Sequence, residues 1–232
     1  MKTADRIFVA LDTADEKTAL DLAGRLKGLT GGVKLGKEFF TAHGPEGVAK
    51  VAAHAAKVFL DLKFHDIPAT VRGAVSAALR LKPFMLNVHA AGGEQMMRAA
   101  AEAAREAGAG RPLVLAVTVL TSLADADLAA IGVAEPADRQ VLRLAKLAKE
   151  SGLDGVVCSA REAGALRAAL GPDFKLVVPG IRPAWAAADD QKRMTTPKEA
   201  LAAGADYLVI GRPITAAADP AEAARRIADE LA

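Results

Sequence analysis

The chain has 232 residues, of which 52% are hydrophobic and 25% are charged, a composition typical of a globular protein with a sizeable core. Its 30 basic and 28 acidic residues give a formal net charge of +2, which gives no reason to expect a nucleic acid or an anionic membrane as partner. Cys158 is the single cysteine, so an intramolecular disulfide is excluded, and its apolar neighbours favour a buried side chain over a nucleophile.

The N-terminal sequence does not resemble a signal peptide, because Asp5 and Arg6 precede a very short apolar run. No uninterrupted apolar run approaches the roughly 20 residues that span a bilayer. We therefore expect a soluble protein located in the cytoplasm.

Short apolar runs rich in β-branched residues alternate along the chain with stretches of helical composition. The apolar runs predict strands over Ile7–Leu11, Gly32–Leu35, Val58–Leu62, Phe84–Val88, Leu113–Val117, Gly155–Cys158, Lys175–Val178 and Tyr207–Ile210. Helices are predicted over Glu16–Lys27, Gly47–Ala56, Ala69–Leu81, Glu94–Ala107, Asp138–Ser151, Glu162–Leu170, Pro197–Ala203 and Ala221–Leu231. Ser159 and Thr196 stand at N-cap positions, and Pro197 occupies the first helical position.

The order of these elements predicts an α/β fold. The runs are apolar on both faces, as expected for a parallel sheet covered by helices. Eight strand–helix units favour a closed (β/α)8 TIM barrel, with residues 1–232 forming a single catalytic domain. An open doubly wound sheet is the alternative, but Leu11–Asp15 lacks the glycine-rich fingerprint that would follow its first strand.

The third strand run, Val58-Phe-Leu-Asp-Leu-Lys-Phe64, carries charges where a pure core strand would be apolar. Asp61 and Lys63 are two residues apart, so on a regular strand both side chains leave by the same face. Asp66 follows just beyond the strand end. Because buried unpaired charges are costly, this pattern indicates a functional cluster.

Lys34 belongs to the same predicted cluster. It lies late in the second strand, next to the third strand in a barrel, and barrel active sites lie at the C-terminal ends of the strands. Two lysines and two carboxylates, with Asp66 counted, would alternate in space and keep one another charged. A purely structural salt-bridge network is the alternative. Because lysines balance the carboxylates, and the four histidines form no ligand pattern, we expect no metal there.

A second cluster of polar residues predicts a phosphate site. Gly211 and Arg212 end the eighth strand, and Arg182 follows the seventh, where barrels often bind phosphate. The long segment 182–194 is a candidate lid from which Gln191 would reach the phosphate on closure. An ordinary solvated surface loop is the alternative for this segment.

The motif Asp61-x-Lys63-x-x-Asp66-Ile67-Pro68, preceded by Lys34 in Val-Lys-Leu-Gly, resembles the orotidine 5′-monophosphate decarboxylases. The similarity extends over essentially the whole chain, including Pro179-Gly-Ile-Arg182, Asp190-Gln191 and Ile210-Gly-Arg-Pro213. The resemblance implies a homodimeric barrel that converts orotidine 5′-monophosphate to uridine 5′-monophosphate and carbon dioxide without a cofactor, as the last step of de novo pyrimidine nucleotide synthesis.

The resemblance also implies roles for individual residues. Lys63 would donate a proton to C6 of the pyrimidine, and Asp61 would lie beside the leaving carboxylate. Lys34 and Asp12 would contact ribose hydroxyls.

Other implied roles concern the partner subunit and the rest of the nucleotide. Asp66 and Thr70 would reach the partner subunit's site, and Ile67 between them counts among the substrate-binding residues. Thr121 and Pro179 would line the nucleotide pocket. The phosphate would be held by Arg182, Gln191, Gly211 and Arg212.

Two alternative functions stay open. A metal-dependent sugar-phosphate lyase or aldolase of the wider suprafamily shares the Asp-x-Lys-x-x-Asp motif. A catalytically silent protein that binds nucleotide phosphates would need the phosphate cluster but not the lysine–aspartate set.

Overall fold

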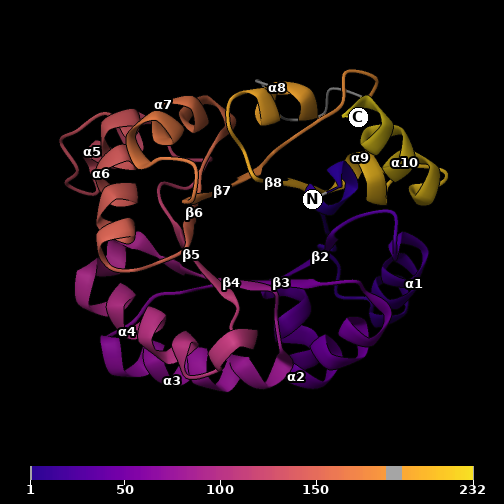
Figure 1. Cartoon of the computed structure of the whole chain (residues 1–232), viewed down its shortest axis with the longest axis horizontal. Helices are drawn as coiled ribbons and strands as arrows, with labels where there is room; N and C mark the ends of the chain where they lie inside the picture. Colours follow the sequence, from indigo (N-terminus) through magenta and orange to yellow (C-terminus); the bar gives the residue numbers. More distant parts are fainter. Residues whose placement is uncertain (1, 187–194, 232) are drawn as a thin grey trace.

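The computed structural model describes residues 2–186 and 195–231, and within these ranges eight parallel strands close into a barrel ringed by helices (Figure 1). The strands pair in chain order, and the last pairs with the first. They are β1 (Ile7–Ala10), β2 (Gly32–Gly36), β3 (Val58–Phe64), β4 (Met85–His89), β5 (Leu113–Val117), β6 (Gly155–Val157), β7 (Lys175–Pro179) and β8 (Tyr207–Ile210). The predicted (β/α)8 barrel is confirmed, and the open-sheet alternative is wrong.

The helices form the outer layer. They are α1 (Glu16–Leu26), α2 (Lys37–His54), α3 (Pro68–Ala78), α4 (Gly93–Arg105), α5 (Asp125–Ala130), α6 (Ala137–Glu150), α7 (Ala160–Leu170), α8 (Pro197–Ala202), α9 (Arg212–Thr215) and α10 (Pro220–Glu230). Thr196 caps α8 and Pro197 follows as predicted. Of the helices in the described ranges, none has the length and apolar character needed to cross a bilayer.

Three helical segments differ from the prediction. Helix α2 begins at Lys37 rather than Gly47. It consists of two helical pieces that meet at a kink at Gly44, where φ is 58°. The Gly44-Pro45 pair predicts a break in the helix, so the helical piece that precedes it was not predicted. The short helices α5 and α9 were not expected either, since they are too brief to show helical periodicity.

The core has two layers, one inside the barrel and one between barrel and helices. On β1, Phe8 points inward while Ile7 and Val9 point toward the helices, and all three are fully buried. This arrangement explains why the strands are apolar on both faces. The interior layer consists of Phe8, Ala10, Phe59, Met85, Leu115, Val177, Tyr207 and Val209. It fills the barrel below the site described next.

Strand β3 departs from regular geometry close to its C-terminal end. Three residues separate Leu60 from Phe64 on β3, whereas Asn87 alone separates their partners Leu86 and Val88 on β4. Within this bulge Lys63 has a left-handed backbone, with φ of 53°. The strand therefore runs two residues longer than predicted, and the simple alternation assumed for Asp61 and Lys63 does not hold there.

Candidate active site

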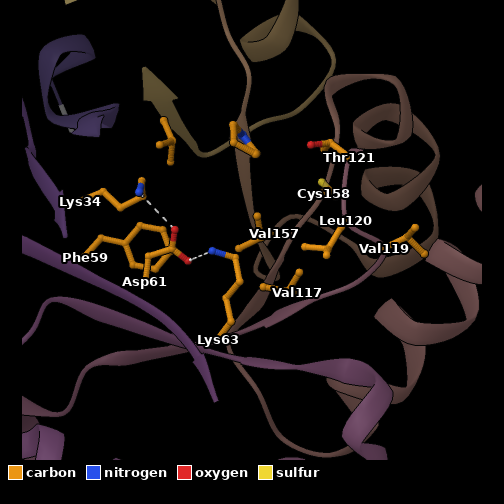
Figure 2. Close-up of a pocket in the computed structure, with 12 residues that line it drawn as sticks. Lys34, Phe59, Asp61, Lys63, Val117, Val119, Leu120, Thr121, Val157 and Cys158 are labelled. Carbon is orange, nitrogen blue, oxygen red and sulfur yellow. Dashed lines mark hydrogen bonds and ion pairs between the residues drawn. The ribbon is translucent and has the colours of Figure 1, made fainter. Parts of the chain in front are cut away.

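Asp12, Lys34, Asp61 and Lys63 form a continuous series of ion pairs at the C-terminal end of the barrel, and Figure 2 shows the part from Lys34 through Asp61 to Lys63. Lys34 Nζ lies 2.8 Å from Asp12 Oδ1 and 3.3 Å from Asp61 Oδ2. Lys63 Nζ lies 2.6 Å from Asp61 Oδ1. Lys34 points inward because its neighbours in β2 pack against the helices, and Gly36 leaves room beside its ammonium group. The charges alternate from Asp12, which follows β1, through Lys34 on β2 to Asp61 and Lys63 on β3.

Burial and charge act in opposite directions on Asp61. The side chains of Lys34 and Asp61 are only 10% and 11% exposed, while Lys63 is 25% exposed. Burial alone would raise the pKa of Asp61, but the ammonium groups of Lys34 and Lys63, with hydrogen bonds from Lys63 and Asn87, hold this pKa below its ordinary value. Asp61 is therefore a carboxylate at neutral pH.

Asp66 does not join this chain of charges. It lies in the turn after β3, is exposed, and accepts a hydrogen bond from the backbone N–H of Ile67 (2.7 Å). Across residues 2–186 and 195–231, no ion pair links Asp66 to Lys34 or Lys63. The expected alternation of two lysines with Asp61 and Asp66 inside one subunit is therefore wrong for Asp66. Asp12 is the second carboxylate of the series instead. The bulged strand β3 extends to Phe64, and Asp66 lies two residues beyond its end.

A cavity of about 210 Å³ opens beside Lys34, Asp61 and Lys63 (Figure 2). Thr121 and Pro179 line it, as the resemblance implies. Its remaining walls are apolar and are formed by Phe59, Val117, Val119, Leu120, Val157, Cys158 and Val209. The cavity thus combines one charged wall with an apolar one, which suits a flat organic group that carries a local charge.

Cys158 is buried as predicted. Burial raises the pKa of its thiol. The side chain is therefore a neutral, apolar part of the cavity wall.

The expected phosphate residues follow the neighbouring strands β7 and β8. Arg182 is buried, and its backbone N–H donates to the Thr195 carbonyl (3.1 Å), which closes the base of the intervening loop. Gly211 follows β8 directly as the N-cap of α9, and Arg212 is the first residue of that helix. Gln191 lies outside the described residues, as does most of the candidate lid.

Asn87 is a site residue that we did not predict. It lies in β4 with 0% exposure, donates to Asp61 Oδ1 (2.7 Å) and accepts from the backbone N–H of Lys63 (2.8 Å). The only signal in the sequence is a polar residue in the apolar run Met85-Leu-Asn-Val88. That signal is weak, because a single asparagine in a strand does not reveal its partners.

His89 ends β4 beside the charged chain. Its ring centroid lies 5.5 Å from that of His65. Burial, the nearby His65 and the cations Lys37 and Lys63 lower the pKa of His89 to about 4, so its imidazole is neutral at pH 7. Throughout the described part of the chain, no group of three or more His, Cys, Asp or Glu side chains is placed to hold a metal ion.

Comparisons with known proteins agree with this geometry. A model of the "Orotidine 5′-phosphate decarboxylase / HUMPS family" matches residues 5–227. The chain is 57% identical to an orotidine 5′-phosphate decarboxylase of Rhodospirillum rubrum, over 99% of this chain and 95% of that protein. The corresponding protein of Paramagnetospirillum magneticum is 55% identical over 97% of each chain.

Solved structures give the same result. The crystal structure of an orotidine 5′-phosphate decarboxylase from Lactobacillus acidophilus superposes with a TM-score of 0.87 at 40% identity, covering 97% of this chain and 98% of that one. The enzyme of the same name from Pyrococcus horikoshii gives a TM-score of 0.78 at 25% identity, covering 97% of this chain and 98% of that one. The chain belongs to the orotidine 5′-phosphate decarboxylase / HUMPS family.

Proposed function

We propose that this chain removes carbon dioxide from orotidine 5′-monophosphate to form uridine 5′-monophosphate, with Lys63 as the proton donor and without a cofactor. The family and its relatives indicate this activity and a place in pyrimidine biosynthesis. The observation that carries the finer proposal is the Asp12–Lys34–Asp61–Lys63 series of ion pairs, of which Lys34, Asp61 and Lys63 line the cavity.

The chemistry requires a fixed cation next to C6. The bond between C6 and the carboxylate carbon breaks, carbon dioxide leaves, and the electron pair stays on C6 until a proton arrives. An ammonium group that is already in place stabilises this developing charge without reorganisation during the reaction. Lys63 fits this role because Asp61 holds it at 2.6 Å and it reaches the cavity. Its proton then completes the C6–H bond.

Asp61 has two functions in this proposal. As a carboxylate it keeps Lys63 and Lys34 in position from either side. It also lies beside the leaving carboxylate of the substrate, where a second negative charge favours departure of carbon dioxide over its retention.

The rest of the nucleotide extends from the charged wall toward β7 and β8. Asp12 and Lys34 contact the ribose hydroxyls, while Thr121 and Pro179 border the nucleotide. The phosphate is bound by Arg182, Gln191, Gly211 and Arg212, which follow the strands where barrels often bind phosphate. Binding energy gained there, remote from C6, is available to hold the pyrimidine in its reactive position.

The active form is a homodimer in this proposal. Asp66, Ile67 and Thr70 are exposed around the start of α3, and Ile67 leaves 66% of its surface uncovered. An exposed isoleucine next to an exposed aspartate, whose carboxylate accepts a hydrogen bond only from the Ile67 N–H among the described residues, is suited to contact a second copy of the chain. Asp66 and Thr70 then complete the partner subunit's site.

The proposed organisation is one catalytic domain over residues 1–232, located in the cytoplasm. The family match over residues 5–227 supports the single domain. No feature of the structure tests the location, which stays a prediction.

Release of carbon dioxide from carboxyl-labelled orotidine 5′-monophosphate tests the function directly. We expect release at an undiminished rate in the presence of EDTA. Activity that disappears with the chelator would favour a metal-dependent sugar-phosphate lyase of the wider suprafamily. Tight binding of uridine 5′-monophosphate with no carbon dioxide release would indicate a silent binding protein.

A further inference from the structure

Asn87 stands out because its amide side chain is fully buried between the apolar residues Met85, Leu86 and Val88 of β4. Its neighbours Leu86 and Val88 are also fully buried, but they belong to the layer between barrel and helices. Asn87 therefore faces the barrel interior, next to β3. A buried amide persists in such a place only when its donors and acceptors are used.

Both ends of the Asn87 amide bind the segment that carries the proposed catalytic groups. Its Nδ2 donates to Asp61 Oδ1 (2.7 Å), and its Oδ1 accepts from the backbone N–H of Lys63 (2.8 Å). One side chain thus spans Asp61-Leu62-Lys63 from the neighbouring strand. The contact to Lys63 involves its main chain rather than its ammonium group.

The main-chain contact matters because the backbone of Lys63 is unusual. Its φ of 53° lies in the left-handed region, which is unfavourable for a residue with a Cβ. Lys63 also lies within the bulge, where β3 and β4 lose their regular pairing between Leu60 and Phe64. The Asn87 carbonyl oxygen takes the place of the β4 main-chain acceptor that the bulge removes.

The second contact fixes the carboxylate. Asp61 Oδ1 accepts from both Asn87 Nδ2 and Lys63 Nζ, at 2.7 and 2.6 Å, while Oδ2 faces Lys34. The donor from Asn87 leaves Asp61 one orientation in which it holds both lysines. Within the described residues Asn87 does not itself line the cavity.

We propose that Asn87 is a positioning residue, which sets the left-handed backbone of Lys63 and the orientation of Asp61 so that the ammonium group faces the cavity before substrate binds. The inference rests on the proposed function. It adds a residue that acts through Lys63 and Asp61 without touching the substrate.

The test replaces Asn87 by a side chain of similar size without hydrogen-bonding groups. For Asn87→Leu we expect kcat to fall on the order of 100-fold, the effect of a misplaced catalytic group, with KM and affinity for uridine 5′-monophosphate within about threefold of wild type. Leu86→Ala is the matched control, since it disturbs the same strand on the opposite face. It should lower the unfolding temperature but leave kcat within about threefold.

A second variant separates the two contacts. Asn87→Asp keeps the shape and an acceptor for the Lys63 N–H, but puts a carboxylate against Asp61 in place of a donor. We expect a comparable loss of kcat, and this variant decides the question if Asn87→Leu does not fold. Wild-type kcat in either folded variant would overturn the inference.

A crystal structure of Asn87→Leu gives a readout that does not depend on activity. We expect Lys63 to lose its left-handed backbone or its contact with Asp61 Oδ1. An unchanged φ and an unchanged Lys63–Asp61 contact would overturn the inference. If the wild-type protein releases no carbon dioxide from orotidine 5′-monophosphate, the proposed function fails, and that outcome is distinct from an active wild type with an equally active Asn87 variant.

Discussion

The two ends of the barrel both carry ion pairs, but they use them in different ways. At the N-terminal end, Asp154 precedes β6 and accepts two hydrogen bonds from Arg111 and one from the backbone N–H of Val114. Asp206 precedes β8 and accepts from Arg167 and from the backbone N–H of Leu176. Each carboxylate thus joins a neighbouring strand to an arginine, and a cavity of about 440 Å³ borders Asp154 but not Arg111, Arg167 or Asp206.

At the C-terminal end Lys34, Asp61 and Lys63 all line one cavity, and they pair with one another rather than with the strand main chain. Lys63 is held in a left-handed backbone, which for a non-glycine residue costs roughly 1–2 kcal/mol. The ammonium groups of Lys34 and Lys63 border open space rather than main-chain carbonyls. The difference indicates that one end of the barrel is organised for stability and the other for chemistry, at some cost in stability.

The largest effect expected from this comparison is the loss of activity in Lys63→Ala. Removing the proposed proton donor and the cation next to C6 should lower kcat by about 1,000-fold or more. Binding of uridine 5′-monophosphate should persist, because the phosphate contacts are untouched. Carbon dioxide release and isothermal titration with product measure the two quantities.

Lys82 offers a matched control for that variant. Among the described residues it is the other lysine with a left-handed backbone, with φ of 48°, but it is exposed and lies before β4 at the opposite end of the barrel. Lys82→Ala should leave turnover unchanged. A turnover of Lys63→Ala within tenfold of wild type would contradict the proposed role.

At the N-terminal end we expect a substitution to lower stability and leave activity unchanged. Asp206→Ala leaves the Leu176 N–H without its acceptor and the Arg167 guanidinium without its carboxylate partner, so we expect a loss of about 2 kcal/mol in the free energy of unfolding. Below the unfolding transition, kcat should equal that of wild type. Urea unfolding and carbon dioxide release measure these effects.

The exposed pair of Arg225 and Glu222 provides the comparison for Asp206. Glu222→Gln should change the free energy of unfolding by less than about 0.5 kcal/mol, because exposed pairs contribute little. Equal losses in the two variants would show that the hydrogen bonds to the strand main chain add nothing.

A smaller effect is expected from pH, through His89. The pKa of His89 in the folded protein is about 4, below its ordinary value of 6.5. Between these values the unfolded chain binds a proton that the folded chain does not, so the free energy of unfolding falls as pH falls from 6.5 toward 4. His89→Gln should make this decline shallower, because it removes the group that binds a proton only on unfolding. Identical slopes for wild type and His89→Gln would contradict the pKa assignment.

Much of the charged end was predictable because its features are local. Strand periodicity places Lys34 and Asp61 at strand ends, and parallel strands joined by helices pair in chain order, so their proximity follows from the barrel. The same reasoning locates Arg182 and Arg212 after neighbouring strands. These inferences need only the order of strands.

The rest depends on pairing between distant segments. The bulge at Leu60–Phe64 arises from the register of β3 against β4, and Asp61-Leu-Lys63 contains no glycine that would indicate a left-handed residue. The role of Asn87 follows from that bulge and was invisible for the same reason. Asp66 lies beyond the strand end as predicted, but its expected pairing with the lysines of the same subunit was wrong, because sequence proximity to Lys63 does not show which way the turn after β3 directs its carboxylate.

The smallest expected effect concerns Trp185, which links the segment after β7 to α10. Its indole Nε1 donates to Glu230 (2.6 Å), and Arg226 lies 4.4 Å from the ring centroid. Trp185→Phe keeps a ring for Arg226 but removes the donor, so we expect a loss of about 1 kcal/mol in the free energy of unfolding. Glu230→Gln, which keeps an acceptor, should lose less. Because Arg182 lies three residues earlier on the same segment, KM should rise more than kcat falls in Trp185→Phe. A change in kcat without a change in KM would instead indicate that the substitution acts on Lys34, Asp61 and Lys63.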